Sequence, residues 1–234
     1  DGRSISRFDS ALGVEVSLAP TYTRMCRELL SRKRGYGSRL LDASQIEVPL
    51  DWFQQSRASR AVNMGLRSLK KRFRTTGSCA NKPVVSLVAI DPVSREVLAL
   101  SSSASPSSGR DGIVDLKEAA PVLKPLPSTS SRFSSDMGQV TLVELTNTYA
   151  SMAADGLYKD PILIRRVDGL ERRELWPDSN AADRVLTVHQ AQAVIRILEA
   201  SASNTRSGEE LILSHLPGRG GSSTSGRDGW YFGF

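Results

Sequence analysis

The chain has 234 residues, 39% hydrophobic and 24% charged, which is the size and composition of a globular protein with one large or two small domains. Its formal net charge of +6 favours anionic surroundings, such as a membrane face, a wall polymer or nucleic acid, without selecting one of them. Two cysteines, Cys26 and Cys79, exclude a disulfide framework and lack metal-ligand spacing, and no apolar run is long enough to span a membrane.

Residues 1–44 are predicted to be a linker region before a domain that spans residues 45–234. Within that region, residues 22–30 favour a short helix, ended by a basic run and Gly35. The chain begins with Asp1 and stops inside a strand pattern, so we expect a piece of a longer protein. The lack of a signal peptide therefore carries little weight.

A clear helix follows a strand-like alternation at residues 45–50. Asp51 can cap this helix, with Gln54 three residues further on. Ser68 and Lys71 within it spell S-x-x-K. Helical spacing predicts one buried apolar stripe, made of Ala58, Ala61, Val62, Gly65, Leu66, Leu69 and Phe73. The other face carries Arg57, Arg60, Arg67, Lys70 and Arg72.

Two pairs of strands are predicted further along the chain. Residues 83–100 indicate a hairpin, because two β-rich runs flank the turn signal Asp91-Pro92. Residues 162–167 and 171–175 form the second candidate pair. Between these pairs, residues 101–136 contain a serine-rich stretch of low complexity and are predicted to be mainly loop.

Two capped helices are predicted in the second half of the chain. Thr141 and Glu144 form a capping box, and Gly156 ends that helix. Thr187 and Gln190 open the other helix. Its apolar stripe is predicted to be Ala191, Val194, Ile197 and Leu198.

The candidate binding site lies near the end of the chain, where a glycine-rich stretch precedes an aromatic strand signal at residues 230–234. Glycines let a ligand approach the backbone closely, because no Cβ stands in the way. Arg219 adds a permanent cation, and the neighbouring serines add small hydrogen-bond donors. The candidate substrate-binding residues are Arg219, Gly220, Gly221, Ser222 and Ser223.

This segment resembles the G-K-T-G-T-T…R-D-A-W-F-V-G-Y stretch of the penicillin-binding transpeptidases. Arg219 stands where the family has lysine, and Gly220 where it has threonine. The runs G-Q-V-T-L-V-E-L-T-N-T-Y-A at residues 138–150 and A-I-D-P-V-S-R-E-V-L-A-L at residues 89–100 are also similar to family runs, with Arg95 in place of the usual turn glycine. The ungapped matches in the terminal segment are Gly218, Gly221, Arg227, Asp228, Trp230 and Gly233.

The resemblance implies a mixed α/β fold in which helices cover an antiparallel sheet, as in penicillin-binding transpeptidases and β-lactamases. By this resemblance, the domain is expected to be shortened over residues 101–136 and incomplete at its C-terminus. The opening I-E-V-P-L-D-W-F-Q-Q at residues 46–55 resembles the segment that follows the glycosyltransferase in class A bifunctional enzymes. The parent protein is therefore expected to be membrane-anchored, with a glycosyltransferase domain, at the periplasmic face of the bacterial inner membrane.

The family reaction is acyl transfer during peptidoglycan synthesis. A serine, activated by a lysine three residues on, attacks the D-Ala–D-Ala carbonyl of a stem peptide, an S-x-N loop relays protons, and the K-T-G strand holds the terminal carboxylate. Here S-x-N is missing. The S-x-x-K at Ser68 and Lys71 is rejected as the nucleophile motif, because it lies in the opening helix, before the first strand of the catalytic sheet. Arg219 can still bind a carboxylate. We expect weak, non-covalent binding of a stem peptide or β-lactam, with no catalytic residue, metal or cofactor.

Two alternatives remain open. An active transpeptidase would use a serine of residues 101–108 or 128–135 with Lys117 or Lys124 as base, and covalent labelling by a fluorescent penicillin would reveal it. A basic nucleic-acid-binding module would use Arg219-Gly220-Gly221 and residues 70–74. The second alternative is disfavoured, because nucleic-acid grooves usually combine basic and stacking residues. No nucleic-acid partner is therefore expected.

Overall fold

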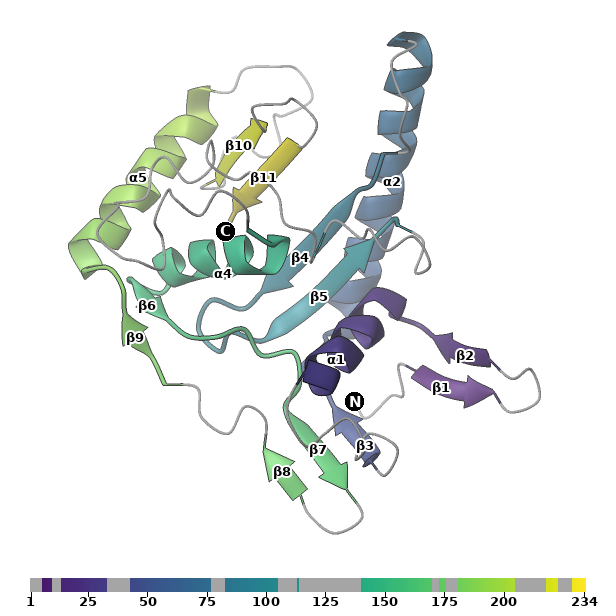
Figure 1. The fold of residues 1–234 in the computed structure, drawn as a ribbon. Coiled ribbons are helices and arrows are strands. Elements are labelled where there is room, and N and C mark those ends of the chain that lie inside the picture. The colour runs from purple at the N-terminus through teal and green to yellow at the C-terminus, as the bar shows by residue number, and fades with distance from the viewer. Residues whose placement is uncertain are drawn as a thin grey trace. The chain divides into compact units, whose positions relative to one another are not determined.

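The structure is a computed structural model that forms two compact units (Figure 1). It describes residues 6–9, 14–32, 43–76, 83–104, 113, 140–169, 173–175, 181–204, 218–222 and 229–234. The first unit comprises Asp1–Ala89, Glu96–Ile113 and Ile162–Ser179. The second unit comprises Ile90–Arg95, Val114–Pro161 and Asn180–Phe234.

The first unit combines two helices with short antiparallel strand pairs. Its helices are α1 (Pro20–Arg32) and α2 (Trp52–Thr76). Its strands are β1 (Ser6–Asp9), β2 (Val14–Ser17), β3 (Ala43–Glu47), β4 (Ser86–Ile90, whose last residue belongs to the second unit), β5 (Val97–Ser102), β7 (Arg166–Gly169) and β8 (Arg173–Leu175). The sheets are β1-β2, β4-β5 and β3-β7-β8, and both helices pack against β5 (Figure 1).

The second unit has the same mixed character. Its helices are α4 (Leu142–Ala153) and α5 (Val188–Asn204). Its strands are β6 (Leu157–Tyr158), β9 (Asp183–Arg184), β10 (Gly218–Ser222) and β11 (Gly229–Gly233), paired as β6-β9 and β10-β11. The predicted mixed α/β class is confirmed. The described strands form several small sheets rather than one continuous sheet.

Helix α1 is held in the first unit by buried side chains on one face. Tyr22 and Leu30 have no exposed surface, and the hydroxyl of Tyr22 lies within donating distance of the carbonyl oxygens of Val97 (3.1 Å) and Leu163 (3.0 Å). Burial raises the pKa of the neighbouring Cys26 thiol to about 12. The predicted short helix is confirmed. It lies inside the region predicted to be a linker, and the domain division at residue 44 stays a prediction.

Helix α2 begins as its sequence predicts. Asp51 Oδ1 accepts a hydrogen bond of 2.8 Å from the backbone N–H of Gln54, which satisfies one of the unpaired N–H groups of the first turn. The side chain of Gln55 is buried, accepts from the N–H of Leu100 at 2.8 Å and donates to its carbonyl at 3.1 Å. The predicted buried stripe is wrong at Ala61, which is exposed, because the buried face is narrower than the apolar spacing suggests.

The predicted hairpin of residues 83–100 is confirmed as β4 and β5. The turn between them is closed by Asp91 Oδ1, which accepts hydrogen bonds from the N–H groups of Val93 and Ser94 at 2.9 and 2.7 Å. Arg95, at the end of the turn, has φ of 67°, in the left-handed region that favours glycine. Its side chain is only 1% exposed, and its Nη2 donates to the carbonyl of Leu157.

The strand predicted at residues 162–167 begins later than expected. Ile162 makes one isolated parallel bridge with Glu96, and regular pairing of β7 with β3 and β8 starts only at Arg166. Leu163 and Ile164 are buried before the strand begins, so the apolar run that suggested a strand is core packing. The predicted partner at residues 171–175 is confirmed as β8.

In the part of the chain that the structure describes, no helix combines the length and apolar character needed to cross a membrane.

Candidate functional site: the β10-β11 strand pair

The candidate site is built on a regular antiparallel pair. Arg219 of β10 lies opposite Phe232 of β11, and Gly220 and Gly221 lie opposite Tyr231 and Trp230. Among the described strands, β10 pairs with β11 alone. Its other edge therefore presents a row of backbone donors and acceptors that no described strand uses.

The pair is anchored by aromatic packing from β11. The ring of Phe232 is buried and lies 5.1 Å from that of Tyr149 on α4, with 24° between the ring planes. Trp230 stacks on the same Phe232 at 5.8 Å. These contacts belong to the core of the second unit, which consists of Val140, Leu145, Tyr149, Met152, Leu186, Val194, Leu198 and Phe232. Since α5 packs against β10 and α4 against β11, the strand pair is supported by two helices.

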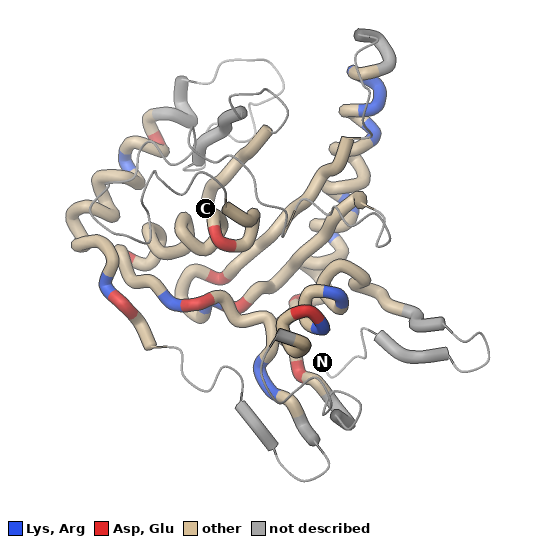
Figure 2. The backbone as a smooth tube through the Cα atoms, in the orientation of Figure 1, with Lys and Arg blue, Asp and Glu red and all other residues tan. Residues whose placement is uncertain are grey.

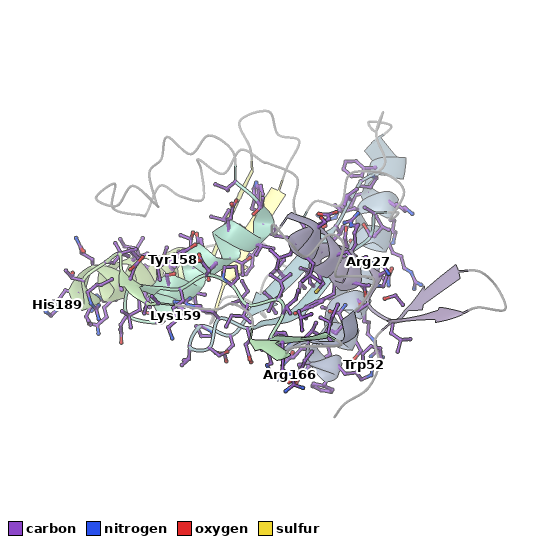
Figure 3. The ribbon with its side chains drawn as sticks, turned by 60° about the horizontal axis from the view of Figure 1, so that its bottom comes forward. Arg27, Trp52, Tyr158, Lys159, Arg166 and His189 are labelled. Atoms are coloured by element: carbon purple, nitrogen blue, oxygen red, sulfur yellow. The ribbon has the colours of Figure 1, made fainter. Side chains whose placement is uncertain are left out.

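The two supporting helices have the predicted N-terminal caps. Thr141 and Glu144 form the capping box of α4 with both of its hydrogen bonds, and the N–H of Gln190 donates to the hydroxyl of Thr187 at the start of α5. The stripe predicted for α5 is confirmed at Ala191, Val194 and Leu198 but is wrong at Ile197, which is 47% exposed. His189, in the first turn of α5, is exposed (Figure 3).

Helix α4 ends at Ala153, three residues before the glycine predicted to end it, and Gly156 lies in the turn that follows. Gly156 has φ of 80°, and its carbonyl accepts hydrogen bonds from the N–H groups of Val185 and Leu186 at 3.0 and 3.2 Å. A Cβ at this position would clash with the backbone of Leu186. Gly156 therefore permits both the turn after α4 and the close approach of the segment that leads into α5.

The candidate residues are only partly gathered by the described structure. Arg219, Gly220, Gly221 and Ser222 are consecutive positions of β10, as predicted, whereas Ser223 lies outside the described residues. The resemblance to the family's K-T-G strand predicts a strand at these positions, whereas a glycine- and serine-rich run by itself is also typical of a turn. What the sequence did not single out is Tyr149 together with Phe232, which secures that strand to α4.

The serines proposed as alternative nucleophiles fall into two groups. Ser101, Ser102 and Ser103 are described at the end of β5. The hydroxyl of Ser101 lies 3.4 Å from that of Ser59. The hydroxyl of Ser102 accepts a hydrogen bond from that of Ser86 at 3.0 Å, and the hydroxyl of Ser103 accepts one from the N–H of Val85 at 2.8 Å. The remaining serines proposed, and the bases Lys117 and Lys124, lie outside the described residues.

The S-x-x-K spelled by Ser68 and Lys71 lies within α2, and both residues are exposed. This position agrees with its rejection as a nucleophile motif. Within the described ranges, no three histidine, cysteine or acidic side chains gather where they would hold a metal ion.

No protein-family model and no curated protein matches the chain. The chain does match solved protein structures. PonA1 from Mycobacterium tuberculosis, in complex with penicillin V, superposes with a TM-score of 0.58 at 13% identity, over 92% of this chain and 79% of that one. A second structure of the penicillin-binding protein PonA1 from the same organism gives 0.57 at 14% identity, over 92% and 78%. The apo form of its penicillin-binding protein 3 gives 0.50 at 15%, over 80% and 67%.

These structures define the class of fold. The chain has the mixed α/β fold of the penicillin-binding transpeptidase domains, in a divergent form. At this level of identity the likeness concerns the fold, and function has to be argued from the site.

Proposed function

We propose that the chain is a transpeptidase-like domain of peptidoglycan biosynthesis that binds the carboxylate end of a stem peptide, or a β-lactam, without becoming acylated. The observation that carries the proposal is the register of β10, a glycine-rich strand with Arg219 and one edge not used by a described strand. A peptide can add to such an edge through its backbone. Arg219 then offers a guanidinium for the terminal carboxylate.

The fold supports this reading, since a solved neighbour with the same fold was determined with penicillin V bound. The resemblance of residues 218–233 to the family's K-T-G region supports the proposed position of the site. Binding without chemistry follows from the missing nucleophile, because a carboxylate-binding strand polarises and orients a substrate but does not break its bond. By the same reasoning, we propose that the parent protein is a class A enzyme, anchored in the inner membrane with a glycosyltransferase domain, and that this domain faces the periplasm.

The test measures binding and acylation separately on the purified chain. We expect no covalent band with a fluorescent penicillin on a denaturing gel. We expect a peptide ending in D-Ala–D-Ala to bind more tightly than the same peptide with a C-terminal amide. A hydrogen bond to a charged group contributes about 1.5–3 kcal/mol, so Arg219→Gln is expected to weaken binding of the carboxylate peptide by about tenfold to a hundredfold.

Two controls make the result specific. Arg27→Gln removes an exposed charge from α1 and is expected to leave peptide affinity unchanged. The amide peptide is expected to be insensitive to Arg219→Gln. A covalent penicillin adduct would contradict the absence of acylation, and mapping it would identify the nucleophile. Equal affinity for the carboxylate and amide peptides would contradict the binding role of Arg219.

A further inference from the structure

Helix α2 presents an exposed stripe of basic and apolar side chains. Successive residues of a helix are turned by about 100°, so positions spaced by four, three, four, three and four fall in one narrow stripe. The residues at these positions are all exposed: Phe53, Arg57, Arg60, Met64, Arg67 and Lys71. We call this set the basic face of α2.

The opposite side of α2 fixes this face in its outward position. Gln55, Ala58 and Val62 are buried on that side, and α2 packs there against β5. The two hydrogen bonds between Gln55 and Leu100 connect the buried side of α2 to β5 and so define which side of the helix faces the sheet. The basic face therefore points away from β5.

The charge of α2 is entirely of one sign. Residues 52–76 contain seven lysines and arginines and no aspartate or glutamate. Figure 2 shows Lys and Arg along the described part of α2, with no acidic residue between them. Exposed helices of globular proteins commonly interleave both signs, which lets i,i+4 pairs form. No acidic residue within α2 itself therefore offsets its positive potential.

Two large apolar side chains stand among these cations. Phe53 and Met64 are each 63% exposed, and the guanidinium of Arg57 lies 5.1 Å from the centre of the Phe53 ring. Trp52, which precedes Phe53 and is labelled in Figure 3, is 40% exposed. Basic residues mixed with protruding aromatic and aliphatic side chains are the features of helices that lie in the interface of an anionic membrane.

We propose that the basic face of α2 binds the surface of anionic phospholipid bilayers, with the helix lying along the membrane. Arg57, Arg60 and Arg67 contact lipid phosphates, while Phe53 and Met64 enter the region beneath the headgroups. A nucleic acid would satisfy the cations, but the aromatic residues Phe53 and Trp52 both lie at the start of the helix, whereas single-strand grooves place stacking residues along the bound strand. An anionic bilayer is the partner that uses both the charges and the apolar pair.

The experiment is vesicle co-sedimentation of the whole 234-residue chain. One vesicle set is pure phosphatidylcholine, and in the other a third of the lipid is phosphatidylglycerol. We expect binding only to the second set, weakened by added salt. A cation near an anionic surface contributes about fivefold to the partition coefficient, so Arg60→Gln with Arg67→Gln is expected to weaken binding by about tenfold or more.

Matched variants separate the contributions. Arg27→Gln with Arg196→Gln removes the same charge from exposed positions on α1 and α5. The logarithm of its partition coefficient is expected to fall by less than half as much as that of Arg60→Gln with Arg67→Gln. Phe53→Ser with Met64→Ser is expected to weaken binding most at high salt, where the charges are screened. Circular dichroism verifies that each variant retains the helix content of the parent chain.

Three results would overturn the proposal. The first is no preference for phosphatidylglycerol vesicles over phosphatidylcholine. The second is an equal loss from the two double arginine variants, which would make the effect one of net charge rather than of this face. The third is tight, face-dependent binding of a single-stranded oligonucleotide without vesicle binding, which would assign the basic face of α2 to nucleic acid.

Discussion

The ring of Phe232 stacks on the ring of Tyr149, with 5.1 Å between the ring centroids. Tyr149 belongs to α4, and Phe232 belongs to β11, opposite Arg219 in the partner strand. This one contact therefore connects the strand pair that carries the candidate site to the helix at the centre of the second unit. Aromatic stacking of this kind adds about 0.5–1.5 kcal/mol to the gain from burial alone.

Truncation of Phe232 tests that connection. Phe232→Ala removes a buried ring from the core, and such changes cost about 3–5 kcal/mol of unfolding free energy. Tyr231→Ala is the control, because Tyr231 is the next residue of β11 and is exposed. It is expected to change the unfolding free energy by at most about 1 kcal/mol. Urea denaturation followed by tryptophan fluorescence measures both. Similar losses in the two variants would mean that β11 is not anchored through Phe232.

The effects of an added Cβ at two glycines, Gly156 and Gly229, can be compared in the same way. Gly156→Ala forces a Cβ against the backbone of Leu186 at a φ of 80°, so we expect a loss of more than about 2 kcal/mol or failure to fold. Gly229→Ala places its Cβ in open space and is expected to be nearly neutral. Expression yield and thermal melts distinguish the two. A Gly156→Ala variant as stable as Gly229→Ala would rule out the close approach of residues 156 and 186.

Local signals predicted the ends and the buried sides of helices well. Asp51, Thr141 and Thr187 were expected to cap helices and each accepts the hydrogen bond that this role requires. Capping depends on residues within one turn of each other, so it is readable from a short stretch. Exposed Ala61 and Ile197 show the limit, because the width of a buried stripe depends on what the helix packs against.

Contacts between segments that are distant in the sequence cannot be predicted from local patterns of this kind. The pairing of β3 with β7 and the bonds from Tyr22 to the carbonyls of Val97 and Leu163 join residues far apart in the chain. No local pattern encodes such partners, so the sequence predicts the helix of residues 22–30 but not its packing against β5. The resemblance to the family's K-T-G strand predicts the candidate strand β10, whereas no pattern predicts the contact of Tyr149 with Phe232 on the neighbouring strand β11.

Arg95 offers a prediction about the β4-β5 turn. Both Arg95→Ala and Arg95→Gly remove the buried guanidinium, but only glycine adopts a φ of 67° without steric cost. We therefore expect the glycine variant to be more stable than the alanine variant by about 1 kcal/mol. Comparison of their denaturation midpoints isolates the backbone term, because the side-chain loss is nearly the same in both. An alanine variant equal to or better than glycine would show that the turn does not hold this conformation.

The same turn predicts a pH dependence. Hydrogen bonds from the N–H of Ser94, then from Val93 and the Ser94 hydroxyl, together with the charge of Arg95, hold the pKa of Asp91 below its usual range, although burial opposes them. A carboxyl group with a lowered pKa in the folded state stabilises the fold above its unfolded pKa. That contribution is lost as the pH falls through the folded pKa.

We therefore expect Asp91→Ala to be less stable than the parent chain at neutral pH, with the difference shrinking as the pH falls below the ordinary pKa of an aspartate. Val93→Ala, an exposed change in the same turn, is the control, and its difference from the parent chain is expected to be independent of pH. Denaturation midpoints measured from neutral pH into the acid range provide the comparison. A difference for Asp91→Ala that persists unchanged at the acid end would show that its carboxylate does not close the turn.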